Sequence, residues 1–196
     1  MNINSSVLPA IRDLKDLDTA IKHDYEYVVL LNTYIGQLKS IVKMLHSNQK
    51  KVLIHADLVQ GLRNDEYATQ FLCKDIRPDG VISTRKNVLL TAKKHKLITI
   101  QRFFLLDSIA LESSYQTLKS IEPDSVEVLP GVIPHMITEI YEKTKIPVIA
   151  GGLIRTKKEV KAALEAGAMA ITTSKKELWS YQDDLHLTEF RKNKIV

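Results

Sequence analysis

Residues 146–174 read IPVIAGGLIRTKKEVKAALEAGAMAITTS. A short apolar run opens the stretch and predicts a buried strand, and a glycine pair at 151–152 follows it. Thr156 and Glu159 match the T-x-x-E capping box that starts many helices. An amphipathic segment then runs to Gly167, a typical helix end, before a second apolar run. The stretch therefore predicts one strand–helix–strand unit of a parallel sheet.

The same alternation extends over the whole chain. Amphipathic segments with helical spacing separate eight short apolar runs, which recur about every 23 residues. The predicted strands begin near Val7, Tyr25, Lys51, Gly80, Leu97, Ser125, Ile146 and Ala168. Eight such units favour a single-domain small (β/α)8 TIM-like barrel, with an open doubly wound sheet as the alternative. The barrel is expected over residues 1–179, and residues 180–196 are a C-terminal tail of uncertain structure.

Composition narrows the class of protein. Hydrophobic residues make up 44% and charged residues 26% of 196 residues, as in an ordinary globular domain. Cys73 is the single cysteine, which excludes an internal disulfide. The first residues lack a secretory signal, and no apolar run approaches the roughly 20 residues that span a bilayer. We therefore expect a cytoplasmic protein without a membrane partner. The net charge of +5 permits contact with a polyanion without requiring it.

The ends of the last two predicted strands carry a candidate phosphate site. Barrels of this class place their working residues at the C-terminal ends of the strands. There the sequence has Gly151 and Gly152 after one strand, and Thr172, Thr173 and Ser174 after the next. Glycines let backbone N–H groups approach an anion closely, so the two loops together predict phosphate binding. The alternative is that the glycine pair forms only a tight turn.

Charged residues at other strand ends are candidates for binding the rest of a ligand. Asp57 either contacts a ligand or is structural, bonded to Arg102 or Arg12 on a neighbouring strand. His55, two residues earlier on the same face, is more simply structural. Glu127 interrupts an apolar run, and it either binds ligand hydroxyls or acts as a base, or pairs with an arginine.

Two kinds of enzyme site have little support in the sequence. The candidate metal ligands His55, Asp57, Glu127 and His135 form no dense ligand motif, so no metal site is expected. No predicted strand interior presents a lysine, which argues against Schiff-base aldolase chemistry. We therefore assign no catalytic residue and no metal ligand.

Five segments in order along the chain carry a family resemblance. They are HADLVQGLRNDEYATQFL from residue 55, IRPDGVISTRKNVL from residue 76, TIQRFFLLDS from residue 99, VEVLPGVIPHMI from residue 126, and IAGGLIRTKKEVKAALEAGAMAITTSKKELW from residue 149. With LPAIRD at residue 8, they make the chain resemble the glycerol-3-phosphate-responsive antiterminators of bacterial glycerol operons. The resemblance covers nearly all of the chain except residues 180–196.

The resemblance implies a regulator rather than an enzyme. Such a protein binds glycerol 3-phosphate as effector, needs no cofactor, and acts on leader mRNA to promote terminator readthrough and stabilise the transcript. By position, the resemblance implies that the phosphate is bound by Gly151, Gly152, Thr173 and Ser174. It implies that the glycerol end is bound by Asp57, Glu127 and Arg102. The lysines that follow the phosphate loops are candidate RNA contacts, although each is equally well read as a solvated helix end: Lys157, Lys158, Lys175 and Lys176.

The sequence leaves the oligomeric state and one alternative function open. A homo-oligomer is possible as the oligomeric state. The alternative function is a TIM-barrel enzyme of isomerase or aldolase type acting on a small sugar or polyol phosphate.

Overall fold

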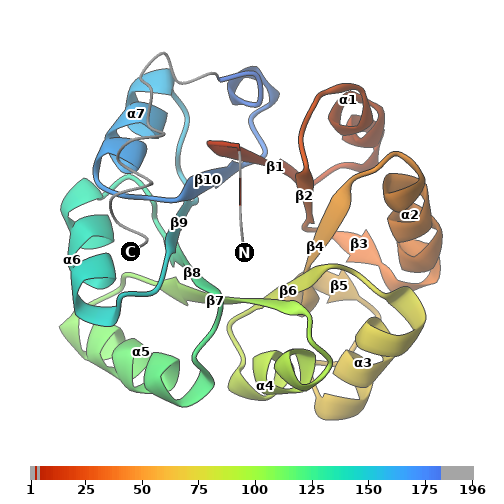
Figure 1. Cartoon of the computed structure of the whole chain (residues 1–196), viewed down its shortest axis with the longest axis horizontal. Coiled ribbons are helices and arrows are strands. Elements are labelled where there is room, and N and C mark those ends of the chain that lie inside the picture. Colours follow the sequence, from red (N-terminus) through yellow and green to blue (C-terminus); the bar gives the residue numbers. More distant parts are fainter. Residues whose placement is uncertain (1–2, 4, 182–196) are drawn as a thin grey trace.

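Eight parallel strands close into a barrel in the computed structural model, which describes residue 3 and residues 5–181 (Figure 1). The strand order around the barrel is β1-β10-β9-β8-β7-β6-β4-β2. Their bounds are β1 (Val7–Ile11), β2 (Tyr27–Leu30), β4 (Lys51–His55), β6 (Gly80–Ser83), β7 (Ile98–Phe104), β8 (Ser125–Leu129), β9 (Val148–Gly151) and β10 (Ala170–Thr173). Closure confirms the predicted (β/α)8 barrel and excludes the open sheet.

Helices form the outer ring (Figure 1). In the described part of the chain these are α1 (Leu17–Lys22), α2 (Ile35–Ser47), α3 (Glu66–Phe71), α4 (Lys86–Lys94), α5 (Ser108–Ile121), α6 (Pro134–Thr144) and α7 (Lys157–Glu165). The predicted capping box of Thr156 and Glu159 is present at the start of α7. Pro134 occupies the first turn of α6, where its missing N–H has no intrahelical partner to lose.

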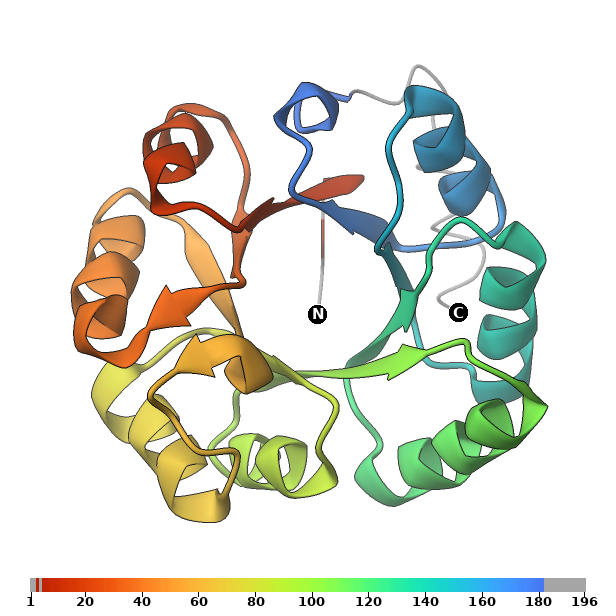
Figure 2. The same ribbon diagram turned by 180° about the vertical axis from the view of Figure 1, so that it is seen from behind.

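Short elements complete the connections between strands and helices. They are η1 (Leu14–Asp16), η2 (Ala56–Leu58), a single π-helical turn η3 (Leu72–Ile76) and η4 (Lys176–Leu178). A second, two-stranded parallel sheet joins β3 (Thr33–Tyr34) to β5 (Val59–Gln60). These strands follow β2 and β4, so they lie on the face that carries the C-terminal ends of the barrel strands (Figure 2). Sequence analysis missed them because two residues are too few for an alternating pattern.

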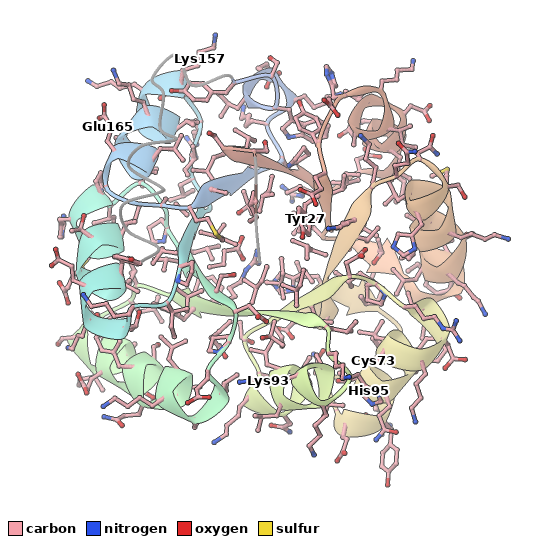
Figure 3. All side chains as sticks on the ribbon, viewed as in Figure 1. Tyr27, Cys73, Lys93, His95, Lys157 and Glu165 are labelled. Carbon is pink, nitrogen blue, oxygen red and sulfur yellow. The ribbon has the colours of Figure 1, made fainter. Side chains whose placement is uncertain are left out.

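The interior of the barrel is apolar toward the N-terminal ends of the strands. Strand register and inward orientation place four fully buried side chains in one layer: Leu8, Leu53, Ile100 and Ile149. Tyr27 lies at the barrel wall below that layer (Figure 3). Ile3 is 6% exposed and packs against the same cluster, so it closes this end of the barrel.

The interior becomes polar toward the C-terminal ends. The next layer contains Val29, Ile82, Glu127 and Thr172, and the layer above it contains Ala10, His55, Arg102 and Gly151. Both layers draw their side chains from alternate strands, so residues far apart in sequence meet here. The mouth of the barrel is therefore where polar groups converge.

The end of the chain is only partly described. Trp179 is 2% exposed, and its indole Nε1 donates a hydrogen bond to the Thr173 carbonyl oxygen at 2.8 Å. The barrel thus packs up to residue 179, whereas residues 182–196 of the expected tail lie outside the described residues. No helix in the described ranges has both the length and the hydropathy to cross a bilayer.

Candidate functional site

Glu127 is the centre of a buried polar network at the mouth. Its side chain, on β8, is 1% exposed. Arg102 on β7 donates from Nε to Glu127 Oε2 at 2.5 Å, and Thr172 on β10 donates from Oγ1 to Oε1 at 2.5 Å. The sequence left Glu127 between an ion pair and a ligand contact, and the structure contains the ion pair. The carboxylate thereby holds Arg102 and Thr172 in place from both sides.

Arg102 is the member of this network that retains free donors. Its Nε pairs with Glu127, and its two terminal nitrogens donate to no other described residue. The side chain is 12% exposed, so the guanidinium is held mostly out of solvent. A guanidinium fixed by one carboxylate and open at its outer nitrogens is suited to binding an oxygen-rich ligand.

Steric constraints favour glycine at positions 151 and 152. A Cβ at Gly151 would lie 2.6 Å from Thr172 Oγ1 and 2.8 Å from Glu127 Oε1. The hydrogen bond between those two side chains therefore leaves no room for a side chain on β9. Gly152 has φ of +72°, a backbone conformation that favours glycine, and a Cβ there would approach Leu129 Cδ2 at 3.1 Å. The backbone conformation thus favours glycine at position 152, and the Glu127 network favours it at position 151.

The three hydroxyl residues at the end of β10 point in different directions. Thr172 points into the barrel and bonds to Glu127. Thr173 points outward, and its Oγ1 accepts a hydrogen bond from the Lys175 N–H at 3.1 Å. Ser174 is exposed and lines a shallow cavity of about 730 Å³. Of the two predicted phosphate residues here, Ser174 lies beside the cavity, whereas the Thr173 hydroxyl is bonded to the loop backbone.

That cavity adds Arg12 to the candidate residues. Arg12 follows β1, and the full lining comprises Arg12, Asp13, Leu14, Lys15, Asp16, Asn32, Ser174 and Lys176. Arg12 makes no ion pair with another described residue, whereas Lys176 Nζ lies 2.8 Å from Asp16 Oδ1. The cavity therefore places one uncommitted guanidinium beside a serine of the predicted phosphate loop.

Asp57 is fully engaged by its neighbours. Its Oδ1 accepts from Ser83 Oγ at 2.5 Å, and its Oδ2 accepts from the N–H and Oγ1 of Thr84 at 2.7 and 2.8 Å. The structural alternative named Arg102 or Arg12 as partner, and that detail is wrong, because η2 turns Asp57 toward the end of β6 instead. The carboxylate fixes the β6–α4 loop at the rim.

His55 is a buried residue whose hydrogen-bonding groups are unsatisfied by the residues that the structure describes. It is 2% exposed, and neither ring nitrogen has a hydrogen-bond partner within the described residues. Burial, then the positive charge of Arg102, lower the pKa of His55 from 6.5 to about 4, against the opposing effect of Glu127 and Asp57. The imidazole is therefore neutral at physiological pH. Sequence analysis judged it structural, since a single histidine on an apolar strand carries no signal of what surrounds it.

The four predicted RNA-binding lysines lie on the mouth side of the barrel. Lys157 and Lys158 are exposed and are the first two residues of α7, and Lys157 lies at the outer edge of the molecule (Figure 3). A helix N-terminus disfavours positive charge, so the helix dipole does not account for these two lysines. Lys175 is also exposed, while Lys176 is paired with Asp16. Three of the four are thus free of ion pairs with described residues.

Metal ligands and lysines at the mouth are relevant to possible enzyme chemistry. Among residue 3 and residues 5–181, no cluster of three or more histidine, cysteine or acidic side chains is arranged to hold a metal ion. The inward-facing layers at the described mouth contain no lysine. Lys51, the first residue of β4, and the buried Lys50 lie at the opposite end, where Lys50 Nζ donates to the His23 carbonyl oxygen. The mouth offers an arginine, a neutral histidine and hydroxyl groups.

Several known proteins are similar to this chain in sequence, in fold or in both. A glycerol uptake operon antiterminator regulatory protein from Listeria monocytogenes is 46% identical, with a TM-score of 0.89 over 91% of this chain and 97% of its own. The uncharacterized protein YgcP of Escherichia coli K12 is 32% identical over 89% of this chain and 91% of its own. A deoxyribose phosphate aldolase from Aeropyrum pernix, at 16% identity, 96% and 90% coverage and a TM-score of 0.68, shares the fold alone.

The family follows from the extent of the match. The family model described as glycerol-3-phosphate responsive antiterminator matches residues 7–179, from the first strand of the barrel to the buried Trp179. The chain therefore belongs to the glycerol-3-phosphate responsive antiterminator family.

Proposed function

We propose that this protein is a cytoplasmic sensor of glycerol 3-phosphate that binds the leader mRNA of a glycerol-metabolism operon, promotes terminator readthrough and stabilises the transcript. It uses no cofactor, and glycerol 3-phosphate is its effector. The single observation that carries the proposal is the Arg102–Glu127–Thr172 network, a fixed and partly open polar site at the mouth of a barrel of this family.

The effector's phosphate group binds the loops after β9 and β10. Gly152 allows its backbone to approach the anion, and Ser174 supplies a hydroxyl beside it. Gly151 serves this site by leaving room for the hydrogen bond between Thr172 and Glu127, and Thr173 by accepting from the Lys175 N–H. Arg12 adds positive charge from the cavity wall. The family resemblance and the mouth geometry both support this placement.

The glycerol end extends into the barrel toward Arg102. Glu127 and Asp57 shape this part of the site, and both carboxylates already accept hydrogen bonds from protein donors. Their contribution to binding is therefore exerted through the groups they hold, in addition to any contact with ligand hydroxyls. The absence of a lysine from the described mouth layers supports sensing over Schiff-base catalysis.

Effector and RNA are coupled through the phosphate loops. Glycerol 3-phosphate is an anion, so it cannot raise RNA affinity by charge, and coupling requires two states with different affinities. The loop after β9 continues into Lys157 and Lys158, and the loop after β10 into Lys175. Fixing these loops on the effector orders the lysines that contact RNA phosphates.

A thermal-shift series tests effector binding. Glycerol 3-phosphate at a hundredfold excess over its dissociation constant should stabilise the native state by about 2.7 kcal/mol. Glycerol and inorganic phosphate at the same concentration should shift the melting temperature less. Gly152→Val should abolish the shift, because φ of +72° and contact with Leu129 exclude the branched side chain. Absence of any shift with millimolar glycerol 3-phosphate would overturn the proposal.

A leader-RNA titration tests regulation. The wild-type protein should bind the leader hairpin more tightly as glycerol 3-phosphate is added. Lys157→Ala with Lys158→Ala should weaken RNA binding and reduce the dependence of log affinity on log salt by roughly 0.7 to 0.9 per lost contact. Lys94→Ala with Lys119→Ala removes the same charge from helix ends on the opposite face and is the matched control. Effector-independent RNA binding would contradict the coupling.

A further inference from the structure

His55 differs from the other buried polar groups that lack partners. Unpartnered atoms also occur at Tyr25, Thr33, Asn64, Gln101 and Ser125 within the described residues. Of these, only Ser125 belongs to an inward-facing layer of the barrel, and it lies toward the N-terminal ends of the strands. Gln101 points away from the barrel axis and still donates from its amide nitrogen to two carbonyl oxygens. Within residues 5–181, His55 alone faces the mouth with both of its polar atoms unpaired.

The layer that contains His55 brings one polar side chain toward its ring. The other members of that layer are Ala10, Arg102 and Gly151, and among them only Arg102 has a polar side chain. Leaving a buried polar atom unpaired costs about 1–3 kcal/mol. A neutral imidazole offers one N–H donor and one nitrogen acceptor, and a hydroxyl group offers the complementary pair.

The neighbouring acidic groups cannot fill the same role as simply. Glu127 accepts from Arg102 and Thr172, one donor on each oxygen. Asp57 accepts three hydrogen bonds from Ser83 and Thr84. Among the described candidates for the glycerol end, Arg102 and His55 are the groups with an unused hydrogen-bond donor.

We propose that His55 binds a hydroxyl group of the effector and so determines that the site accepts a polyol phosphate rather than any small phosphate ester. This inference rests on the proposed function, because it places the glycerol end of the effector at the mouth. Arg102, held by Glu127, confines that hydroxyl against the imidazole. His55 thus distinguishes ligands by their hydroxyl groups, while the phosphate loops bind the anionic group.

Three ligands and three variants test this role. Calorimetry should compare glycerol 3-phosphate with 3-hydroxypropyl phosphate, which lacks the secondary hydroxyl, and 2-hydroxypropyl phosphate, which lacks the terminal one. The wild-type protein should bind at least one analogue tenfold or more weakly, because a site built for a hydroxyl rejects a ligand without it. His55→Leu should weaken glycerol 3-phosphate by about the same factor while binding that analogue as the wild type does. Ser125→Ala, inside the barrel at its other end, should change neither.

A stability measurement separates binding from a structural role. Leucine replaces an unpartnered polar ring by an apolar side chain, so ligand-free His55→Leu should melt no lower than the wild type. A lower melting temperature together with equal weakening of all three ligands would show that His55 is structural and overturn the proposal. If His55→Leu fails to fold, His55→Gln decides: it retains a donor and an acceptor, and it should preserve the discrimination within a few-fold.

The outcomes also separate this inference from the proposed function. Tight binding of glycerol 3-phosphate without discrimination against either analogue removes the role of His55 and leaves the sensor intact. Failure of the wild-type protein to bind glycerol 3-phosphate removes the sensor and the His55 role with it.

Discussion

The two ends of the barrel interior are built on opposite principles. Toward the N-terminal ends, Leu8, Leu53, Ile100 and Ile149 fill a layer with fully buried aliphatic side chains. Toward the C-terminal ends, the same strands and their neighbours present His55, Arg102, Glu127 and Thr172. Burial is nearly as complete at both ends, so exposure does not distinguish them. The difference lies in the contacts that each end makes. The aliphatic side chains at one end pack against each other, whereas the polar side chains at the other end form a hydrogen-bond network in which some described polar atoms stay unpaired.

The largest effect should come from breaking the network. Glu127→Ala leaves the guanidinium of Arg102 buried without its partner, and such a loss typically costs about 3–5 kcal/mol. Urea unfolding measures the change in the free energy of unfolding. Glu127→Gln, which keeps an accepting oxygen, is the control and should cost less. A loss under about 1 kcal/mol for the alanine variant would mean that solvent replaces the carboxylate and that the mouth is not a closed network.

Truncation at the other end should cost stability without affecting the site. Leu53→Ala removes a fully buried side chain and should lower the free energy of unfolding by about 2–5 kcal/mol. Glycerol 3-phosphate affinity, measured well below the melting temperature, should stay within a factor of two to three. Leu53→Met, which conserves volume, should cost less than about 1.5 kcal/mol. A tenfold loss of effector affinity in the folded alanine variant would show that the two ends are not separable.

Acidification should weaken the polar end selectively. The pKa of His55 falls from 6.5 when unfolded to about 4 when folded, so the unfolded state binds the proton first. This stability contribution is complete above pH 6.5 and is lost as the pH falls toward 4, by on the order of 3 kcal/mol. Urea unfolding of wild-type and His55→Gln protein between pH 7 and pH 4.5 isolates the effect, since other groups titrate in both. Parallel pH profiles would contradict it.

The smallest effect should come from a mouth loop that lies outside the interior. Thr156 caps α7 by accepting from the Glu159 N–H, and Thr156→Ala should cost about 0.5–2 kcal/mol. Effector affinity should change less than twofold, because the cap fixes the helix rather than the ligand. Thr156→Ser retains the hydroxyl and serves as control. A large loss of effector affinity would extend the site from the barrel interior to the start of the helix.

The amino-acid sequence by itself determined the architecture. Apolar runs at regular spacing, a capping box at Thr156 and Pro134 at a helix start are local signals, and each predicted an element that the structure confirms. The predicted strand starts lie within two residues of those in the structure. The remaining differences arise because apolar residues continue from loops into strands, so the pattern does not fix the boundary. The glycine pair and the hydroxyl residues at the ends of β9 and β10 are likewise local signals, and the phosphate site that they indicate stays a prediction.

Tertiary structure alone decided which side chains meet. His55, Arg102 and Glu127 come from three different strands, and only the register of a closed barrel assigns His55 and Arg102 to one layer and Glu127 to the layer beneath them. The same closure leaves no room for a Cβ at Gly151, pairs Asp57 with Ser83 and Thr84 instead of an arginine, and leaves His55 without a hydrogen-bond partner among the described residues. Local periodicity tells which face of a strand is inward, but hydrogen-bond partners across strands depend on register, which sequence spacing does not fix.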